Sequence, residues 1–288
     1  MGAANSSTIR ATVTKVVFYK MTGSGNDFVM LDGRESPVGM WTPGEIQSLC
    51  ARRNGVGADG LVVLGPGSEA GRVRFHFFNN DGRRAAMCGN ASLCATRLSA
   101  QIGLAEPTGM ALETDAGTFQ TRCIEAPGEL AEIDLPDITE LKPVPITLEP
   151  GESSAYLAMV GVPHLVVVTD ESTINSDNLM ERGRYLRWHG AVGPEGANVN
   201  FVRAVGPRLR MRTYERGVEG ETLACGTGAV AAAAVLAASS GVQTPIEILT
   251  SSGKCLSVSG TPAASGEPFR GPRLRGEGRL VFWGEILI

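Results

Sequence analysis

MCGNASLCATRLSAQIGL, residues 87–104, is the stretch of sequence that decides the fold, because a second copy, ACGTGAVAAAAVLAASSGV, occupies residues 224–242. Each copy has a Cys-Gly pair, a small polar residue and a helix-like run that ends at a glycine, Gly103 or Gly241. Glycine is a common residue at the end of a helix. Chance easily supplies one Cys-Gly pair, but not a whole ordered series at matched spacing. The chain therefore contains an internal repeat, which indicates two similar halves.

The segments around the two copies also correspond. Phe75–Phe78 and Leu209–Tyr214 each predict a strand that leads into a polar turn, and a β-type segment with a second turn follows each helix. The Ala-rich run Ala229–Ala238 predicts a helix that is buried on all sides. Strands are frequent and helices are few. We therefore expect an α+β fold of two pseudo-symmetric halves, each a curved, mostly antiparallel sheet around a central helix, with the active site in the cleft between them.

The limits of the halves follow from shifts in composition. Residues 1–14 are predicted to be a flexible tail, 15–134 the first half, and 151–276 the second half. Residues 135–150 are rich in proline and are predicted to be a linker. Within the first half, Thr42 and Glu45 form a capping box that predicts a helix ending near Arg53.

Composition excludes several classes of protein. The 288 residues are 43% hydrophobic and 19% charged, with a formal net charge of −4. This excludes a fully disordered chain, and no concentrated basic face for nucleic acid is present. The longest apolar run is too short to span a membrane, which takes about 20 residues. The N-terminal sequence lacks the apolar core of a secretory signal, so we expect a cytoplasmic protein whose six cysteines are reduced.

Lysine and histidine are scarce. None of the four lysines lies in a context typical of a Schiff base, which argues against pyridoxal phosphate. The three histidines, His76, His164 and His189, show no zinc-ligand spacing. We therefore expect no cofactor, no metal, no nucleic acid and no membrane among the partners, and a small-molecule substrate.

Cys88 and Cys225 occupy the repeated position immediately before a predicted helix. Unpaired backbone N–H groups at a helix start favour negative charge, so we expect a lowered pKa for both thiols and a site for a carboxylate beside them. If the halves face each other, one thiolate removes the α-proton of a bound amino acid and the opposing thiol returns a proton to the other face. The repeat thus predicts stereoinversion. The other four cysteines, Cys50, Cys94, Cys123 and Cys255, are predicted to be packing residues.

Several sequence blocks, in order, make the chain similar to the diaminopimelate epimerase family. They are YKMTGSGNDFV from Tyr19, GVGADGL from Gly55, FNNDGRRAAMCGN from Phe78, PHLVV from Pro163, NVNFV from Asn198 and YERGVEGETLACGTG from Tyr214. The resemblance implies a cofactor-independent isomerase that converts LL-2,6-diaminopimelate to the meso form, in lysine and peptidoglycan biosynthesis. It also implies a homodimer, and a terminal strand over residues 277–288 that returns to the first half.

The resemblance assigns roles to particular residues. It implies that Cys88 and Cys225 are the catalytic thiols and that His164 and Glu215 tune them. The residues implied to bind the amino-acid substrate are Asn26, Asn79, Gly89, Asn90, Asn198, Glu215, Arg216, Gly226 and Thr227.

Three departures from the family pattern leave alternatives open. Val162 stands where many members have Asn, Gly60 where many have Gln, and Arg273 in place of an aromatic residue of the dimer interface. The first two favour a racemase for another amino acid as the closest alternative. A cysteine hydrolase or transferase that pairs one thiol with His164 is a second, although it leaves the repeat unexplained. A non-catalytic binding protein is the third.

Overall fold

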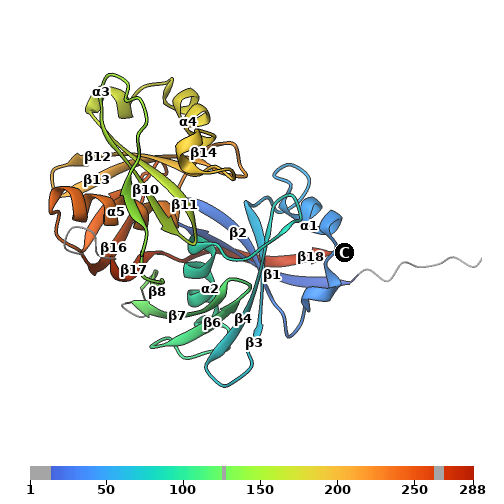
Figure 1. The fold of residues 1–288 in the computed structure, drawn as a ribbon. Helices are drawn as coiled ribbons and strands as arrows, with labels where there is room; N and C mark the ends of the chain where they lie inside the picture. The colour runs from blue at the N-terminus through green and yellow to red at the C-terminus, as the bar shows by residue number, and fades with distance from the viewer. Residues whose placement is uncertain (1–13, 125–127, 263–268) are drawn as a thin grey trace, which may run out of the picture.

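Sheet dominates the architecture, as the α+β prediction requires (Figure 1). The computed structural model describes residues 14–124, 128–262 and 269–288, so the predicted tail lies outside the described residues up to residue 13. The described part of the chain contains eighteen strands and five α-helices. None of its helices combines the length and the apolar content needed to cross a membrane.

The first series of elements runs from β1 to β9. Its two larger helices are α1 (Pro43–Cys50) and α2 (Gly89–Gln101), and η1 (Val38–Met40) is a single 3₁₀ turn. The strands are β1 (Lys15–Gly23), β2 (Asn26–Asp32), β3 (Gly60–Pro66), β4 (Arg72–Asn79), β5 (Arg84–Ala85), β6 (Met110–Thr114), β7 (Gly117–Ile124), β8 (Leu130–Asp134) and β9 (Leu141–Pro143).

The second series runs from β10 to β18. Its helices are α3 (Glu171–Ile174), α4 (Leu179–Arg187), η2 (Gly190–Val192) and α5 (Gly226–Ser240). The strands are β10 (Glu152–Val160), β11 (Val162–Thr169), β12 (Asn198–Val205), β13 (Arg208–Glu215), β14 (Gly220–Thr222), β15 (Ile246–Leu249), β16 (Cys255–Thr261), β17 (Arg270–Glu277) and β18 (Arg279–Leu287).

Strand pairing follows one pattern twice. From β1 to β8 the pairs are β1–β2 antiparallel, β2–β3 parallel, β3–β4 antiparallel, β4–β6 parallel, and β6–β7–β8 antiparallel. The strands from β10 to β17 pair in the same order and directions. In each series the parallel pair that flanks the long helix is joined through that helix, as parallel strands require a crossover.

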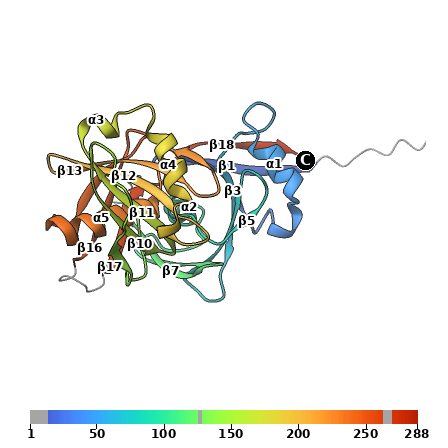
Figure 2. The same cartoon turned by 45° about the horizontal axis from the view of Figure 1, so that its top comes forward.

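The last strand of each series pairs with the first strand of the other. β9, within the range predicted as a linker, pairs with β10, and β18 pairs with β1. Figures 1 and 2 both show β18 alongside β1. A third link is the antiparallel pair β8–β17, in which Ile133 lies opposite Leu274. These pairings join the two series into one continuous sheet.

The two long helices are the most buried elements. Every residue of α2 from Gly89 to Ser99 is buried, and in α5 every side chain from Ala229 to Ala237 is buried, with Ala238 exposed. The prediction of an all-round buried helix is therefore confirmed except at its last residue. Gly241 ends α5 in the left-handed conformation with φ 66°, which glycine adopts without steric cost.

Helix α1 begins as predicted but ends early. The Thr42 side chain and the Glu45 side chain cap each other's backbone N–H groups, so the capping box is confirmed. The helix ends at Cys50 and not near Arg53, because the chain folds back until Gly55 contacts the carbonyl of Ser48. A side chain at Gly55 would collide with that backbone.

The β8–β17 seam carries a buried carboxylate. Glu132 on β8 is buried and accepts hydrogen bonds from Arg122 Nε at 2.9 Å and from Arg275 Nη2 at 3.1 Å. The three residues lie on three neighbouring strands, β7, β8 and β17, so this cluster crosses the junction between the two series.

Replacing this carboxylate should destabilise the fold. Glu132→Ala leaves the two guanidinium groups without their shared acceptor, and we expect the free energy of unfolding to fall by about 1–3 kcal/mol. Urea denaturation measures the change. Glu285→Ala, which removes the exposed pair with Lys15, should change it by at most about 1 kcal/mol. Equal effects of the two substitutions would contradict the role assigned to the seam.

Candidate active site

Cys88 and Cys225 are the N-cap residues of α2 and α5. Both have extended backbone, with φ −141° and φ −128°, so each helix starts immediately after its thiol. The helix starts meet at their first residues: a Cβ built on Gly226 would lie 3.6 Å from the Cα of Gly89. The two predicted catalytic residues, one from each copy of the repeat, are thus brought to one junction.

The second series supplies polar residues to one face of its sheet. Val166, Val202 and Met211 pack in the same core cluster as α5. Side chains alternate along a strand, so residues two positions away face α5 as well. These positions hold polar residues near the start of α5, namely His164, Asn198, Asn200, Thr213 and Glu215.

An amide chain links the two series. Asn26 Nδ2 donates to Asp59 Oδ2 at 3.0 Å, and Asn26 Oδ1 accepts from Asn90 Nδ2 at 2.7 Å. The same Asn90 nitrogen lies 3.4 Å from the carbonyl oxygen of Ala224, the residue before Cys225. Asn26 and Asn90 therefore connect the start of α2 to the segment that leads into α5.

Charged residues hold this amide chain in place. Arg52 Nη2 donates to Asp27 Oδ1 at 2.8 Å and to Asp59 Oδ1 at 2.6 Å, and Lys20 Nζ lies 2.6 Å from Asp27 Oδ2. Burial by itself would raise the pKa of Asp27, but the hydrogen bonds from Arg52 and Lys20 outweigh it and lower this pKa to about 2. The carboxylates of Asp27 and Asp59 are therefore held in fixed positions beside Asn26.

The prediction of lowered thiol pKa values is wrong. Burial raises the pKa of Cys88 to about 11, although backbone N–H groups of Ala91 and Asn90 act in the opposite direction. Burial also raises the pKa of Cys225, and the negative charge of Glu215 adds to the rise. Desolvation of a thiolate costs more here than the helix start returns, so both groups are neutral thiols near pH 7. All six cysteines are free.

His164 and Glu215 lie on the same sheet face but in different surroundings. His164 is fully buried; burial, and then the charge of Arg216, lower its pKa to about 3. The imidazole is therefore neutral at physiological pH. Burial raises the pKa of Glu215, and a hydrogen bond from Thr222 Oγ1 at 2.7 Å partly offsets this.

The other predicted binding residues lie in different surroundings. Asn198 Oδ1 accepts the backbone N–H of Arg216 at 2.7 Å, and the guanidinium of Arg216 pairs with Glu195 at 3.3 Å. Thr227 Oγ1 lies 3.7 Å from Cys225 Sγ. Asn79 is the last residue of β4 and is exposed.

Two residues of the site were missed from the sequence. Asp59 anchors Asn26, and Asn200 contacts His164. The signal for Asn200 was its spacing of two from Asn198, which places both on one face of a strand. No local signal in the sequence pairs Asp59 with Asn26.

Of the three departures, Gly60 has a steric explanation. A Cβ at Gly60 would lie 2.6 Å from the carbonyl oxygen of Phe78 and 2.7 Å from the ring of Phe77, so no side chain fits without a shift. Val162 is half-buried at the start of β11. Arg273 lies on β17, 3.9 Å from Glu132.

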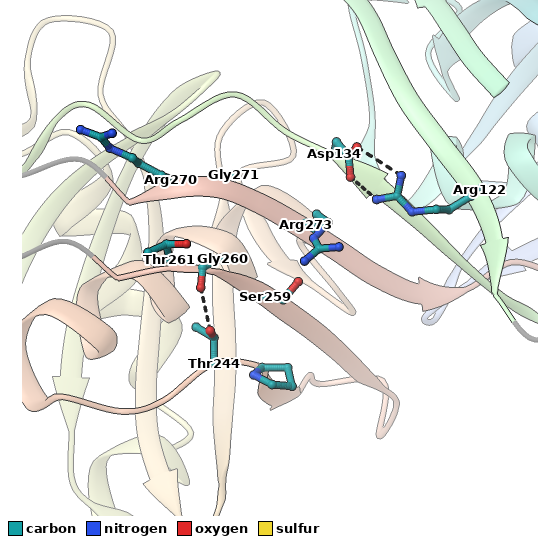
Figure 3. A pocket seen from close by; sticks show the side chains of 10 residues that line it. Arg122, Asp134, Thr244, Ser259, Gly260, Thr261, Arg270, Gly271 and Arg273 are labelled. Atoms are coloured by element: carbon teal, nitrogen blue, oxygen red, sulfur yellow. Dashed lines mark hydrogen bonds and ion pairs between the residues drawn. The ribbon is translucent and has the colours of Figure 1, made fainter. Parts of the chain in front are cut away.

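A surface hollow of about 740 Å³ lies elsewhere, on the outer side of the β8–β17 seam (Figure 3). Arg122, Asp134, Arg270 and Arg273 line it, and Arg122 is bonded to Asp134 within it. None of the predicted site residues lines this hollow. It is therefore separate from the thiol site.

The raised pKa of Cys88 predicts slow alkylation at neutral pH. The thiolate is the reactive form, so the rate of carbamidomethylation at Cys88 by iodoacetamide should rise about tenfold per pH unit from pH 7 to pH 10. Peptide mass spectrometry measures the rate, and protein unfolded in urea is the reference. Glu215→Gln should shift the profile to lower pH, because its charge raises the pKa of Cys88. A plateau below pH 8 in the folded protein would contradict this.

Comparison with known proteins identifies relatives at the level of sequence. A profile of the family described as diaminopimelate epimerase matches residues 18–132 and 156–259. A diaminopimelate epimerase from Gemmatimonas aurantiaca is 47% identical over 283 residues, which cover 93% of this chain and 98% of the relative. A diaminopimelate epimerase from Aquifex aeolicus is 37% identical over 251 residues, 84% of this chain and 88% of the relative.

Solved structures share the fold at low sequence identity. A Bacillus anthracis phenazine biosynthesis protein of the PhzF family has a TM-score of 0.72 at 14% identity, covering 96% of this chain and all of that one. A hydroxyproline epimerase from Agrobacterium vitis has a TM-score of 0.67 at 20% identity, covering 95% and 93%. Together, the profile match, the 47% identity over nearly the whole length and the two helix-start cysteines establish that the chain belongs to the diaminopimelate epimerase family.

Proposed function

We propose that this protein epimerises LL-2,6-diaminopimelate to the meso form, as a cytoplasmic isomerase of lysine and peptidoglycan biosynthesis. The observation that carries the proposal is the pair of N-cap thiols, Cys88 and Cys225, on two helices whose first residues touch. A chain 47% identical to this one bears the name of that enzyme. A reaction on both faces of one carbon needs two acid–base groups, and the repeat supplies two thiols.

The mechanism uses both cysteines in one turnover. The thiolate of one cysteine takes the α-proton and becomes a thiol, which leaves the electron pair on the α-carbon. The thiol of the other cysteine gives its proton to the opposite face and becomes a thiolate, so charge and protons balance. General acid–base catalysis of this kind contributes about 10²–10⁴-fold. Because both resting pKa values are raised, the positive ammonium group of the bound substrate would help the first thiolate to form.

Recognition of the reacting end rests on the helix starts. The backbone N–H groups of Gly89 and Asn90, and those of Gly226 and Thr227, lie in the first turn of each helix, where an α-carboxylate is stabilised. Arg216 is the anchor for the far carboxylate, since a guanidinium pairs with a carboxylate in a bidentate manner.

The proposal also assigns limits to the two halves of the chain. Residues 15–134 and 151–276 form the two sides of the catalytic cleft, with residues 277–288 returned to the first side. The repeated pairing pattern of β1–β8 and β10–β17 supports this division.

A racemase for another amino acid is the second candidate. The packing of Phe77 and Phe78 against Gly60 leaves no side chain at a position where many family members carry an amide. A different far end of the pocket would then select a different substrate with the same two thiols.

Exchange of the α-proton in D2O, followed by NMR, tests both candidates. Reduced protein should introduce deuterium into LL-diaminopimelate and form the meso product, and should leave a panel of ordinary L-amino acids unlabelled. Cys88→Ala and Cys225→Ala should each lower the epimerisation rate by at least about 10²-fold. The matched control is Cys255→Ala, a half-buried cysteine on β16, which should retain activity.

If exchange occurs only with another amino acid, that amino acid is the substrate and the two-thiol mechanism is retained. Absence of exchange on every substrate, from folded and reduced protein, would overturn the proposed reaction.

A homodimer is also part of the proposal, with a second copy of the chain on the free edge of β18. Among the strand pairs of the described residues, β18 takes part in one, the antiparallel pair with β1. Trp283 is 65% exposed and Leu287 is 67% exposed on the same side of this edge strand. An exposed apolar edge favours pairing with another strand, and a two-fold axis makes such an edge self-complementary.

Trp283→Glu should convert the dimer to a monomer, because it places a charge at the centre of the paired edges. Sedimentation equilibrium measures the mass of the assembly. Trp188→Glu is the control, since Trp188 is also exposed but follows α4 on another surface. A wild-type protein that sediments as a monomer at micromolar concentration would refute the dimer.

A further inference from the structure

The two series of strands differ in chemistry at one matched set of positions. In the second series, Thr213 Oγ1 donates to Asn200 Oδ1 at 3.0 Å, and Asn200 Nδ2 lies 3.1 Å from His164 Nδ1. Asn200 and His164 are fully buried, and Thr213 is nearly so. These side chains lie on the α5 face of the sheet, on β13, β12 and β11 in turn.

Strand register identifies their counterparts in the first series as Phe28, Val62 and Phe77. These are apolar, and the two phenylalanine rings pack edge to face with centroids 6.1 Å apart. The repeat is therefore broken at this point: a polar row lies near Cys225, and an apolar cluster occupies the same place near Cys88.

The partners of Asn200 determine the protonation of His164. Asn200 Nδ2 also lies 3.4 Å from the carbonyl oxygen of Leu165, which can only accept, while Oδ1 receives the Thr213 hydroxyl. The amide nitrogen therefore faces His164, and because an amide nitrogen only donates, Nδ1 of the imidazole must be the acceptor. The proton of the neutral ring is then on Nε2. This nitrogen is buried and has no acceptor among the described residues.

The start of α5 is shaped to admit this row. Gly228 and Ala91 are each the third residue after the cysteine of their helix. A Cβ at Gly228 would collide with Asn200 Oδ1 and would lie 3.1 Å from Cys225 Sγ. Both the amide of Asn200 and the thiol of Cys225 thus approach the same point of α5, which only a glycine leaves open. At Ala91, beside the apolar cluster, a methyl group is present.

We propose that Asn200 is a positioning residue which, held by Thr213 and the Leu165 carbonyl, fixes His164 as the Nε2–H tautomer and leaves that N–H to donate to the thiolate that Cys225 becomes. The site is then asymmetric: one thiolate has a neutral side-chain donor and the other relies on its helix start. This inference rests on the proposed two-thiol reaction for its catalytic meaning.

The charged groups around His164 are consistent with a neutral donor. Burial acts against protonation of the ring, and the charge of Arg216 acts in the same direction. Glu215 is on the same sheet face and raises the pKa of Cys225. A neutral N–H donor offsets that effect without adding a buried positive charge.

The first test is the tautomer itself, read from the ¹⁵N chemical shifts of labelled histidine in the full-length protein. His164→Gln identifies the His164 signals among those of the three histidines. In the wild type at pH 7, we expect Nε2 to carry the proton and Nδ1 to be bare. In Asn200→Asp, whose carboxylate accepts but does not donate, the proton should be on Nδ1. A wild-type ring protonated on Nδ1, or on both nitrogens, would overturn the inference.

The second test is kinetic and uses a milder variant in case Asn200→Asp does not fold. Asn200→Asp should lower kcat by about 10- to 100-fold with little change in KM, less than loss of the acid–base group itself. Thr213→Val keeps the shape and removes the anchor of the amide oxygen, so a smaller fall in kcat and a mixture of tautomers are expected.

The matched control is Thr169→Val, a buried threonine whose hydroxyl bonds the Val202 carbonyl at 3.2 Å in the same sheet. It should leave both the tautomer and kcat unchanged. Equal kinetic effects of Thr213→Val and Thr169→Val would show that Asn200 has a structural role only. If no diaminopimelate exchange is found but the tautomer is as expected, the proposed reaction fails and the hydrogen-bond assignment stands.

Discussion

Contact between Gly89 and Gly226 is the constraint on which the site depends. The side chain of Leu274, on the β17 strand of the seam, lies against both glycines, so a Cβ would lie 2.8 Å from Leu274 Cδ2 at Gly226 and 3.2 Å from it at Gly89. The N-cap residues immediately before them are the two cysteines, whose separation is therefore set by backbone packing and not by flexible side chains. The seam between β8 and β17 holds this contact, with buried Glu132 bridging arginines across it. Rigid elements of this kind give a reacting pair its geometry.

Two opposing electrostatic effects meet at each thiol. Backbone N–H groups at a helix start stabilise a thiolate, whereas burial penalises it. At Cys88 and Cys225 burial prevails, and the pKa values of both thiols are raised. The same burial keeps water from an α-carbanion, so the feature that makes the resting thiols inert also protects the intermediate they would create. Burial also keeps His164 neutral. The neutral ring can donate a hydrogen bond in a place where a buried imidazolium would be costly.

Local signals predicted local structure well. The repeated Cys-Gly pairs marked both helix starts, the capping box from Thr42 to Glu45 marked a third, and the Ala-rich run marked a buried helix. What the sequence did not reveal depends on residues far apart in the chain. The bond from Asn90 to the Ala224 carbonyl joins residues in different halves of the sequence, and the early end of α1 depends on the close approach of Gly55 to Ser48. The thiol pKa values were mispredicted because helix starts are visible in a sequence and desolvation is not. Asn200 escaped notice because its role appears only when β11, β12 and β13 are side by side.

The exchange of terminal strands has a topological consequence. β9 completes the second series and β18 completes the first, and Thr14 and Ile288 hydrogen-bond to each other through their backbones at 2.9 Å in both directions. The two ends of the described chain therefore lie side by side. Each unit of nine strands places its last strand next to the first strand of the other unit. A free-standing unit of this kind would satisfy its edge by the same exchange with an identical copy, forming a domain-swapped dimer with a thiol from each subunit at the junction.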